Sequence, residues 1–423
     1  MVEKDSILCS SIQKRSCMNL IDNWFRTAAF QSLEGLNKGH LIVNDGEGTT
    51  NFGDPAEMTA EITVENSAFY RKLLLQGHLG ASEAFAKGWW YTPDLTKVIQ
   101  LLLRHRSILD GLETGPTRLL HPIRNLLNTF RRNNPKGSLR NIALHYDLGN
   151  ELFQEFLDET LSYSCAYFET EHTSLKEASL AKYDRICRKL QITKEDRIIE
   201  IGTGWGGFAI HASTNYGCHV TTTTISRNQY EYVSKLIEAK GLQDKIELLF
   251  QDYRELQGEF DHLVSIEMIE AIGHDHYPIF FKKCSSLLTE QGMAAIQTIT
   301  IQNRYYEQAR REVDFIKAYI FPGSCIPSVS ALFNAMSPTD LRLINSENIG
   351  PHYAKTLRLW RENFFQNRTE LFRLGYDDAF QKIWNMYFSY CEGGFLEGVL
   401  EDHQLVFAKP SAALDMYHST QDL

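Results

Sequence analysis

The centre of this chain is the stretch Asp196-Arg-Ile-Ile-Glu-Ile-Gly-Thr-Gly-Trp-Gly-Gly207, in which a β-branched segment runs into four glycines. Residues 196–201 have the composition of a short buried strand, and a helical pattern begins at Phe208. Glycine is needed at such a turn when a ligand lies over it and leaves no room for side chains. The acid Glu200 sets the turn apart from a dinucleotide fingerprint, and no Lys-Ser/Thr pair of a P-loop follows it. Taken alone, the turn has an equally ordinary structural explanation.

Length and composition indicate a globular protein with more than one domain. The chain has 423 residues, of which 43% are hydrophobic and 12% aromatic, and this length suffices for two or three domains. No apolar run approaches the about 20 residues of a membrane-spanning helix, and the acid-containing start argues against a signal peptide. The eight cysteines are scattered without a C-x-x-C pair. We therefore expect no metal site and no disulfide framework, and we expect a cytoplasmic location.

Charge is distributed unevenly along the chain. The formal net charge of −10 argues against a nucleic-acid partner, because phosphate contacts need clustered Lys and Arg. The segment from Gly115 to Tyr146 nevertheless contains no acid and six Lys or Arg residues. It has two interpretations: a helix packed on the core with a solvated basic edge, or a contact with a membrane surface.

Three parts can be distinguished along the chain. Residues 1–115 predict a small α+β domain, in which Asp45-Gly-Glu-Gly48 signals a hairpin turn and Thr92-Pro93 signals the start of a helix. Residues 116–140 form a basic linker segment. Residues 141–423 form the largest part, which contains the glycine-rich turn.

Strand and helix signals alternate after the turn. Strands are predicted at 219–225, 246–250, 261–266, 293–299 and 404–409, and helices at 227–239, 277–288, 357–372 and 379–390. Such alternation predicts an α/β domain with a parallel sheet and helices on both faces.

Six short motifs, taken together, resemble one enzyme family. They are His145-Tyr-Asp-Leu-Gly-Asn150, Tyr163-Ser-Cys-Ala-Tyr167, Glu200-Ile-Gly-Thr-Gly-Trp-Gly-Gly207, Thr224-Ile-Ser-Arg-Asn-Gln229, Gln251-Asp-Tyr-Arg254 and Ile269-Glu-Ala-Ile-Gly273. In this order they resemble the cyclopropane-fatty-acyl-phospholipid synthase family, which includes the mycolic acid cyclopropane synthases. The match covers roughly residues 141–410, and a weaker likeness over residues 77–95 extends it. The resemblance implies a Rossmann-like S-adenosylmethionine methyltransferase domain, with an antiparallel last strand, beside a smaller N-terminal α+β domain.

The resemblance also implies an activity. Members of the family transfer the methyl group of S-adenosylmethionine to a cis double bond of an unsaturated acyl chain, and most of them close a cyclopropane ring. We expect the substrate to be a membrane phospholipid and the protein to be peripherally associated with the membrane surface. A lipid-binding role of the N-terminal domain is left open. Two alternatives remain: a methyl-branched or methylene product without ring closure, and a lipid-binding protein with a vestigial methyltransferase fold. A homodimer is left open.

The cofactor site that the resemblance implies draws on four of the motifs. Its residues are Tyr163, Ser164, Glu200, Gly202, Gly204, Thr224, Ile225, Gln229, Asp252 and Tyr253. Ordinary alternatives are helix capping for Ser164 and Gln229 and plain packing for Tyr253.

The chemistry demands an unusual pocket. An alkene is a poor nucleophile, so the sulfonium of the cofactor must be held close to it in a dry site. Methyl transfer leaves a carbocation on the acyl chain, which electron-rich aromatic faces can stabilise. A base must then remove a proton from the added methyl group before the ring can close. In the resembling enzymes this base is bicarbonate, and the resemblance implies that it is held by Cys165, Glu270, the backbone at Ile299, and Tyr387. Position 297 is Gln where many relatives have His, and Gln can donate a hydrogen bond but cannot shuttle a proton. Without the family, Cys165 would be interpreted as core packing and Glu270 as a surface acid.

Overall fold

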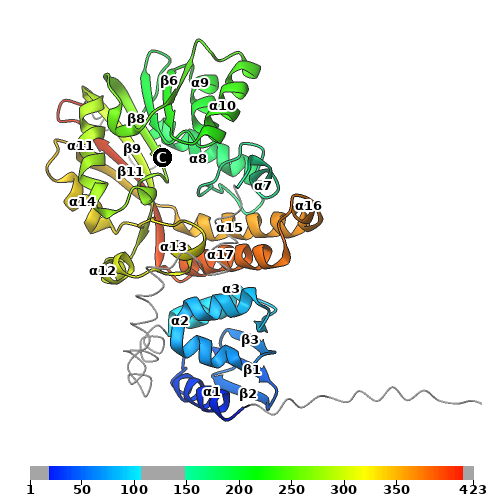
Figure 1. Ribbon diagram of the computed structural model, residues 1–423. Coiled ribbons are helices and arrows are strands. Elements are labelled where there is room, and N and C mark those ends of the chain that lie inside the picture. Colours follow the sequence, from blue (N-terminus) through cyan, green and yellow to red (C-terminus); the bar gives the residue numbers. More distant parts are fainter. Residues whose placement is uncertain (1–18, 106–147, 413–423) are drawn as a thin grey trace, which may run out of the picture. The chain divides into compact units, whose positions relative to one another are not determined.

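The computed structural model describes residues 19–105 and 148–412. The chain divides into two compact units, residues 1–130 and 131–423 (Figure 1). The basic segment 116–140 and the start of the first family motif lie outside the described residues. Within the described ranges, no helix is long and apolar enough to cross a membrane.

The first unit contains a four-stranded sheet in the order β2-β1-β3-β4. Its elements are α1 (Leu20–Leu33), β1 (His40–Asp45), β2 (Gly48–Gly53), β3 (Thr59–Val64), α2 (Ala68–Ala86), β4 (Trp90–Tyr91) and α3 (Leu95–Arg104). The hairpin predicted from the turn at residues 45–48 is confirmed, because β1 and β2 pair antiparallel across it. The β1 strand also pairs parallel with β3.

One helix start in this unit was predicted two residues too early. The N-cap of α3 is Asp94, whose carboxylate accepts the Lys97 N–H at 3.1 Å, and not Thr92. The Thr92 hydroxyl instead accepts the N–H of Asp94 at 3.2 Å. Both residue types favour caps, so the sequence alone did not distinguish the two starts.

The second unit contains a seven-stranded sheet in the order β10-β11-β9-β8-β5-β6-β7. Its strands are β5 (Arg197–Ile201), β6 (His219–Thr224), β7 (Ile246–Phe250), β8 (Phe260–Ile266), β9 (Leu288–Ile301), β10 (Arg342–Asn348) and β11 (Leu400–Ala408). The pairs from β9 to β7 are parallel, whereas β11 runs antiparallel to both β9 and β10. The predicted α/β class and the antiparallel last strand are therefore confirmed.

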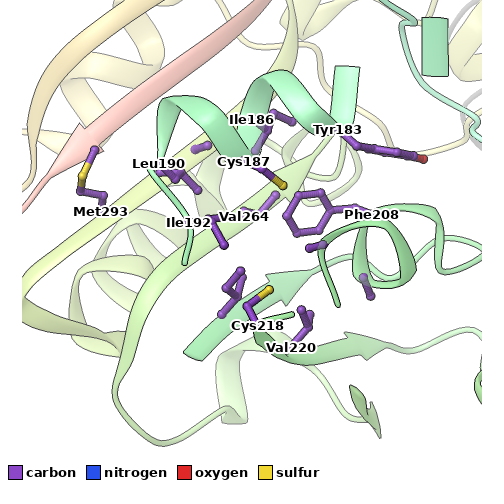
Figure 2. Close-up of a cluster of buried hydrophobic side chains, with 14 of the residues drawn as sticks. Tyr183, Ile186, Cys187, Leu190, Ile192, Phe208, Cys218, Val220, Val264 and Met293 are labelled. Atoms are coloured by element: carbon purple, nitrogen blue, oxygen red, sulfur yellow. The ribbon is translucent and has the colours of Figure 1, made fainter. Parts of the chain in front are cut away.

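Helices cover both faces of this sheet (Figure 1). On one face, α8 (Leu175–Lys189), α9 (Gly207–Asn215) and α10 (Arg227–Lys240) enclose one apolar core; on the other, α11 (Tyr277–Leu287) and α14 (Val329–Met336) enclose a second. Figure 2 shows the first core, with Phe208 beside Cys187 and Val264. Packing in these two cores fixes the positions of the strand ends, from which the loops of the second unit emerge.

The second unit also contains short helical turns and further helices. They are α7 (Asn150–Gln154), the 3-10 turns η2 (Tyr253–Glu255), η3 (Ile269–Ala271) and η4 (His274–His276), and the helices α12 (Asn303–Arg311), α13 (Phe315–Tyr319), α15 (Gly350–Gln366), α16 (Arg368–Arg373) and α17 (Asp378–Leu396). The α15 and α17 helices lie side by side (Figure 1). The helix predicted at 357–372 begins earlier, at Gly350, and is divided into α15 and α16.

Candidate functional site

The glycine-rich turn joins β5 to α9 as predicted. Gly202 and Gly204 have φ values of 102° and 53°, in the region that favours glycine. A Cβ at Gly204 would point into open space, whereas a Cβ at Gly202 would lie 3.2 Å from the side chain of Met268. The turn therefore leaves free space at the carboxyl edge of the sheet, where ligands of α/β proteins bind.

Glu200 is buried at the end of β5. Its carboxyl group accepts the Thr222 hydroxyl at 2.6 Å, and burial raises its pKa to about 8. Glu200 is therefore largely protonated at neutral pH, so it can donate as well as accept a hydrogen bond.

The ends of β6 and β7 present apolar side chains beside this turn. Ile225 and Phe250 are exposed large hydrophobic residues, and Phe250 pairs in register with Thr224. The Thr224 hydroxyl donates to the Gln229 side chain at 2.8 Å, so Gln229 orients that residue instead of only capping α10. A flat apolar group such as adenine would cover this exposed surface.

The two residues predicted after β7 differ in what they can offer a ligand. Asp252 is paired with Arg254 at 2.7 Å, and the hydrogen bond from Arg254 lowers the pKa of Asp252. Tyr253 packs edge-on against Phe280, and its buried hydroxyl has no partner among the described residues. The Asp252 carboxylate is therefore already held by Arg254, whereas the Tyr253 hydroxyl is left for another partner.

An aromatic cluster extends from the turn into the second family motif. The ring of Trp205 lies 4.6 Å from that of Phe153, and Phe153 lies 5.2 Å from Tyr163. The Tyr163 hydroxyl donates to the Tyr387 hydroxyl at 2.9 Å. The structure thus brings together Tyr163 and Tyr387, which are 224 residues apart.

Phe321 connects this cluster to the surface. Its ring lies 6.2 Å from Tyr163 and 5.9 Å from Tyr387, while 40% of the residue is exposed. Tyr163 also contacts the buried Trp360 at 5.3 Å. Electron-rich rings therefore line the interior from the surface to the two tyrosine hydroxyls.

Ser164 binds a buried cation that the sequence analysis missed. The Lys182 ammonium donates to the hydroxyls of Ser162 and Ser164, both at 2.6 Å. Burial lowers the pKa of Lys182. Helix capping is therefore not the role of Ser164, which solvates Lys182 inside the protein.

Glu270 lies in η3, in the loop that follows β8. One carboxyl oxygen accepts the Thr298 hydroxyl at 2.9 Å and the Ile299 N–H at 2.6 Å. The other oxygen is buried without a partner among the described residues. Burial, together with the charge of Glu267, raises the pKa of Glu270 to about 8.

Glu267 was missed from the sequence. Its carboxylate accepts hydrogen bonds from the Cys165 N–H at 2.7 Å, the Gln297 amide at 2.9 Å and the Tyr353 hydroxyl at 2.6 Å. A second acid three residues before Glu270, directly after a buried strand, was the available signal.

Gln297 is held by a network that also includes Asp402, another residue missed from the sequence. Its amide nitrogen donates to Glu267 and, at 3.0 Å, to Asp402, while its oxygen accepts from Gln404 at 3.1 Å. Asp402 is fully buried, and burial together with the charge of Glu267 raises its pKa. Both amide protons of Gln297 are used, so it has none left for an external anion.

The cluster expected to hold bicarbonate does not fit that ion. The Cys165 N–H binds Glu267, the Ile299 N–H binds Glu270, and the Cys165 thiol faces the carbonyl of Ala166 at 3.3 Å. Of the donors that the resemblance implies, the Tyr387 hydroxyl, which accepts from Tyr163, remains. The Glu267 carboxylate already takes the Cys165 N–H and the Gln297 amide, so its charge would repel an added anion.

Comparisons with known proteins identify relatives of this chain. A family model described as mycolic acid cyclopropane synthetase matches residues 133–405. Tuberculostearic acid methyltransferase UfaA1 of Mycobacterium tuberculosis is 36% identical over 376 residues, which cover 86% of this chain and 86% of that protein. Cyclopropane-fatty-acyl-phospholipid synthase of Escherichia coli is 31% identical over 394 residues, 92% of this chain and 94% of that protein.

A solved structure also matches a large part of the chain. Mycolic acid cyclopropane synthase CmaA1, complexed with SAH and CTAB, superposes with a TM-score of 0.58 at 30% identity, covering 65% of this chain and 99% of that one. The resemblance inferred from the six motifs is thus confirmed. The chain belongs to the mycolic acid cyclopropane synthetase family and is an S-adenosylmethionine-dependent methyltransferase.

Proposed function

We propose that this enzyme transfers a one-carbon unit from S-adenosylmethionine to the cis double bond of an unsaturated phospholipid acyl chain, giving a cyclopropane. One observation carries the proposal: the cofactor turn and the polar cluster adjoin. Met268, which lies against Gly202, stands in the chain between Glu267 and Glu270. A methyl donor bound over the turn would therefore lie beside a buried cluster of aromatic and carboxyl groups.

Residues of this chain account for the methyl-transfer step that an alkene must undergo first. The bound cofactor supplies an electrophilic methyl group. Tyr163, Trp360 and Phe321 present aromatic faces, which stabilise positive charge. The Gly202–Gly204 turn, with Ile225 and Phe250 beside it, suits the adenosine part.

A second product has support of its own. The site accounts for methyl transfer more directly than for the proton removal that ring closure needs, because the cluster does not fit bicarbonate. The similar tuberculostearic acid methyltransferase is named for a reaction in which a methyl group is transferred. A methylene chain, formed at the same site by methyl transfer and loss of a proton, is therefore the second candidate; a methyl-branched chain would arise from it through reduction by a separate hydride donor.

Lipid mass spectrometry tests the proposal. Cells that express the protein should accumulate acyl chains one carbon heavier than their unsaturated precursors, and a Gly202→Val variant should not produce them. Chain fragmentation then distinguishes a ring from a branch or methylene group. Unchanged lipids in cells that contain folded wild-type protein would reject both products.

Phospholipid chains lie in a bilayer, so we propose peripheral contact with the membrane surface. The α1 helix supports this: it buries Phe25 and Ala29 but exposes Leu20, Ile21 and Trp24 by 89%, 60% and 50%. Exposed apolar residues at one end of a helix suit insertion among lipid head groups. We assign lipid-surface binding to the first unit and catalysis to the second.

A further inference from the structure

Glu267 has a backbone conformation that normally favours glycine. It follows β8 directly, and its φ is 49°, in the left-handed region. Non-glycine residues held there are uncommon and are maintained where the surrounding structure or function requires them. The chain therefore keeps a charged side chain at a place where the backbone alone would select glycine.

The side chain enters a site made of hydrogen-bond donors. The Cys165 N–H, the Gln297 amide and the Tyr353 hydroxyl converge on its two oxygens at 2.7, 2.9 and 2.6 Å. The Gln297 amide cannot reverse without losing its bonds to Asp402 and Gln404. Donors fixed in this way form an anion site, and the anion in it is the protein's own.

The neighbouring groups determine which carboxyl carries the charge. Glu267 accepts three hydrogen bonds, whereas Glu270 and Asp402 each leave one oxygen without a partner among the described residues. Hydrogen bonds to a carboxylate favour its ionised form. Burial raises the pKa of all three groups, and the charge of Glu267 raises that of the other two further. Glu267 is therefore the first of the three to ionise, and the positive charge of buried Lys182 favours that ionised form.

We propose that Glu267 is the resident anion of this reaction centre: its carboxylate takes the Cys165 N–H and the Gln297 amide, two of the donors expected near bicarbonate, and the enzyme works without an exogenous anion. Glu267 acts as a positioning residue that fixes Gln297 and Tyr353 and places one negative charge near the pocket where positive charge develops. The catalytic part rests on the proposed function, whereas occupancy of the anion site does not.

The binding test uses the full-length protein and needs no turnover. Glu267→Gly removes the carboxylate, leaves the three donors and suits the left-handed backbone, so it should fold. Sodium formate or bicarbonate should raise the melting temperature of this variant by refilling the site. Wild type should show no such shift, and neither should Glu259→Gly, in which the same change is made at an exposed position. A shift in wild type, or none in a folded Glu267→Gly variant, would overturn the proposal.

The activity test distinguishes this proposal from the proposed function. Wild-type turnover should be the same in carbon-dioxide-free buffer and after bicarbonate is restored. Glu267→Gly should lose about tenfold or more in kcat, with an unchanged Kd for S-adenosylmethionine, and formate should restore part of the rate. Wild-type dependence on bicarbonate would overturn the resident anion even if Glu267→Gly fails to fold. A wild type inactive on lipids would reject only the proposed function, because the melting measurements stand without catalysis.

Discussion

At the scale of single residues, the site shows what a linear motif can and cannot reveal. Glycines and motif residues such as Gly202 and Tyr163 could be predicted, because the family resemblance marks them directly. Glu267 and Asp402 could not, because their importance comes from contacts with Gln297, which lies 30 and 105 residues away from them. Contacts between distant parts of the chain bury an acid that has no distinctive feature in the sequence.

Gly202 provides the most direct test of the cofactor site. A Gly202→Val side chain would have to adopt φ near 102° and would press against Met268. We expect binding of S-adenosylmethionine, measured by calorimetry, to fall below detection while the circular dichroism spectrum stays native. Gly46→Val is the matched control, because Gly46 is exposed and a Cβ there meets nothing. Native affinity in folded Gly202→Val would refute the site.

Glu200 gives a prediction about pH. Burial raises its pKa from 4.5 to about 8 in the folded protein, so between these values the folded state binds more protons than the unfolded state. Stability from this group is therefore present below pH 4.5 and is lost as pH rises toward 8. The isosteric Glu200→Gln variant cannot ionise. Its free energy of unfolding should therefore rise relative to that of wild type, by up to a few kcal/mol, between pH 5 and pH 8.

Chemical denaturation of the cofactor-free protein at several pH values measures this gain. Glu259→Gln, at an exposed position, serves as the control and should follow wild type. A difference between Glu200→Gln and wild type that is constant with pH would mean that Glu200 titrates alike in both states.

At the scale of elements, strong local signals were predicted well, whereas the edge strand β10 was missed. Strands β5 and β8 are central, and their buried apolar residues were sufficient to locate them. The edge strand β10 was missed because its residues Arg342–Asn348 are largely polar and half-exposed, with no alternating pattern. Its position depends on pairing with β11, which no local pattern records.

Helix α8 tests how an element supports the site. Ser174 and Glu177 form a capping box at its N-terminus, and the helix carries Lys182 to the site. Ser174→Ala should lower the free energy of unfolding by about 1 kcal/mol. Ser234→Ala, at an exposed position inside α10, should be neutral or slightly stabilising. Equal effects of the two changes in urea denaturation would show that the capping box contributes nothing.

At the scale of the whole molecule, the proposed function requires the enzyme to reach an acyl chain inside a bilayer. Two segments are candidates for that contact: α1, with its exposed apolar residues, and the segment 116–140, whose basic charge is known from the sequence. The first contact would be apolar and the second electrostatic. Salt screens attraction between charges but does not weaken the insertion of apolar side chains. Salt dependence can therefore separate their contributions.

We expect both α1 and the basic segment 116–140 to contribute to vesicle binding. Changing Leu20, Ile21 and Trp24 to Ser should weaken cosedimentation with anionic vesicles at low and high salt alike, because buried apolar area is lost. Changing Arg124, Arg131 and Arg132 to Glu should weaken it only at low salt, since each basic residue near the surface contributes about 1 kcal/mol. Neither variant should alter the Kd for S-adenosylmethionine. If both triple variants bind vesicles like wild type at every salt concentration, the protein meets the membrane through another surface, and the half-exposed Phe321, which borders the aromatic cluster, becomes the next residue to change.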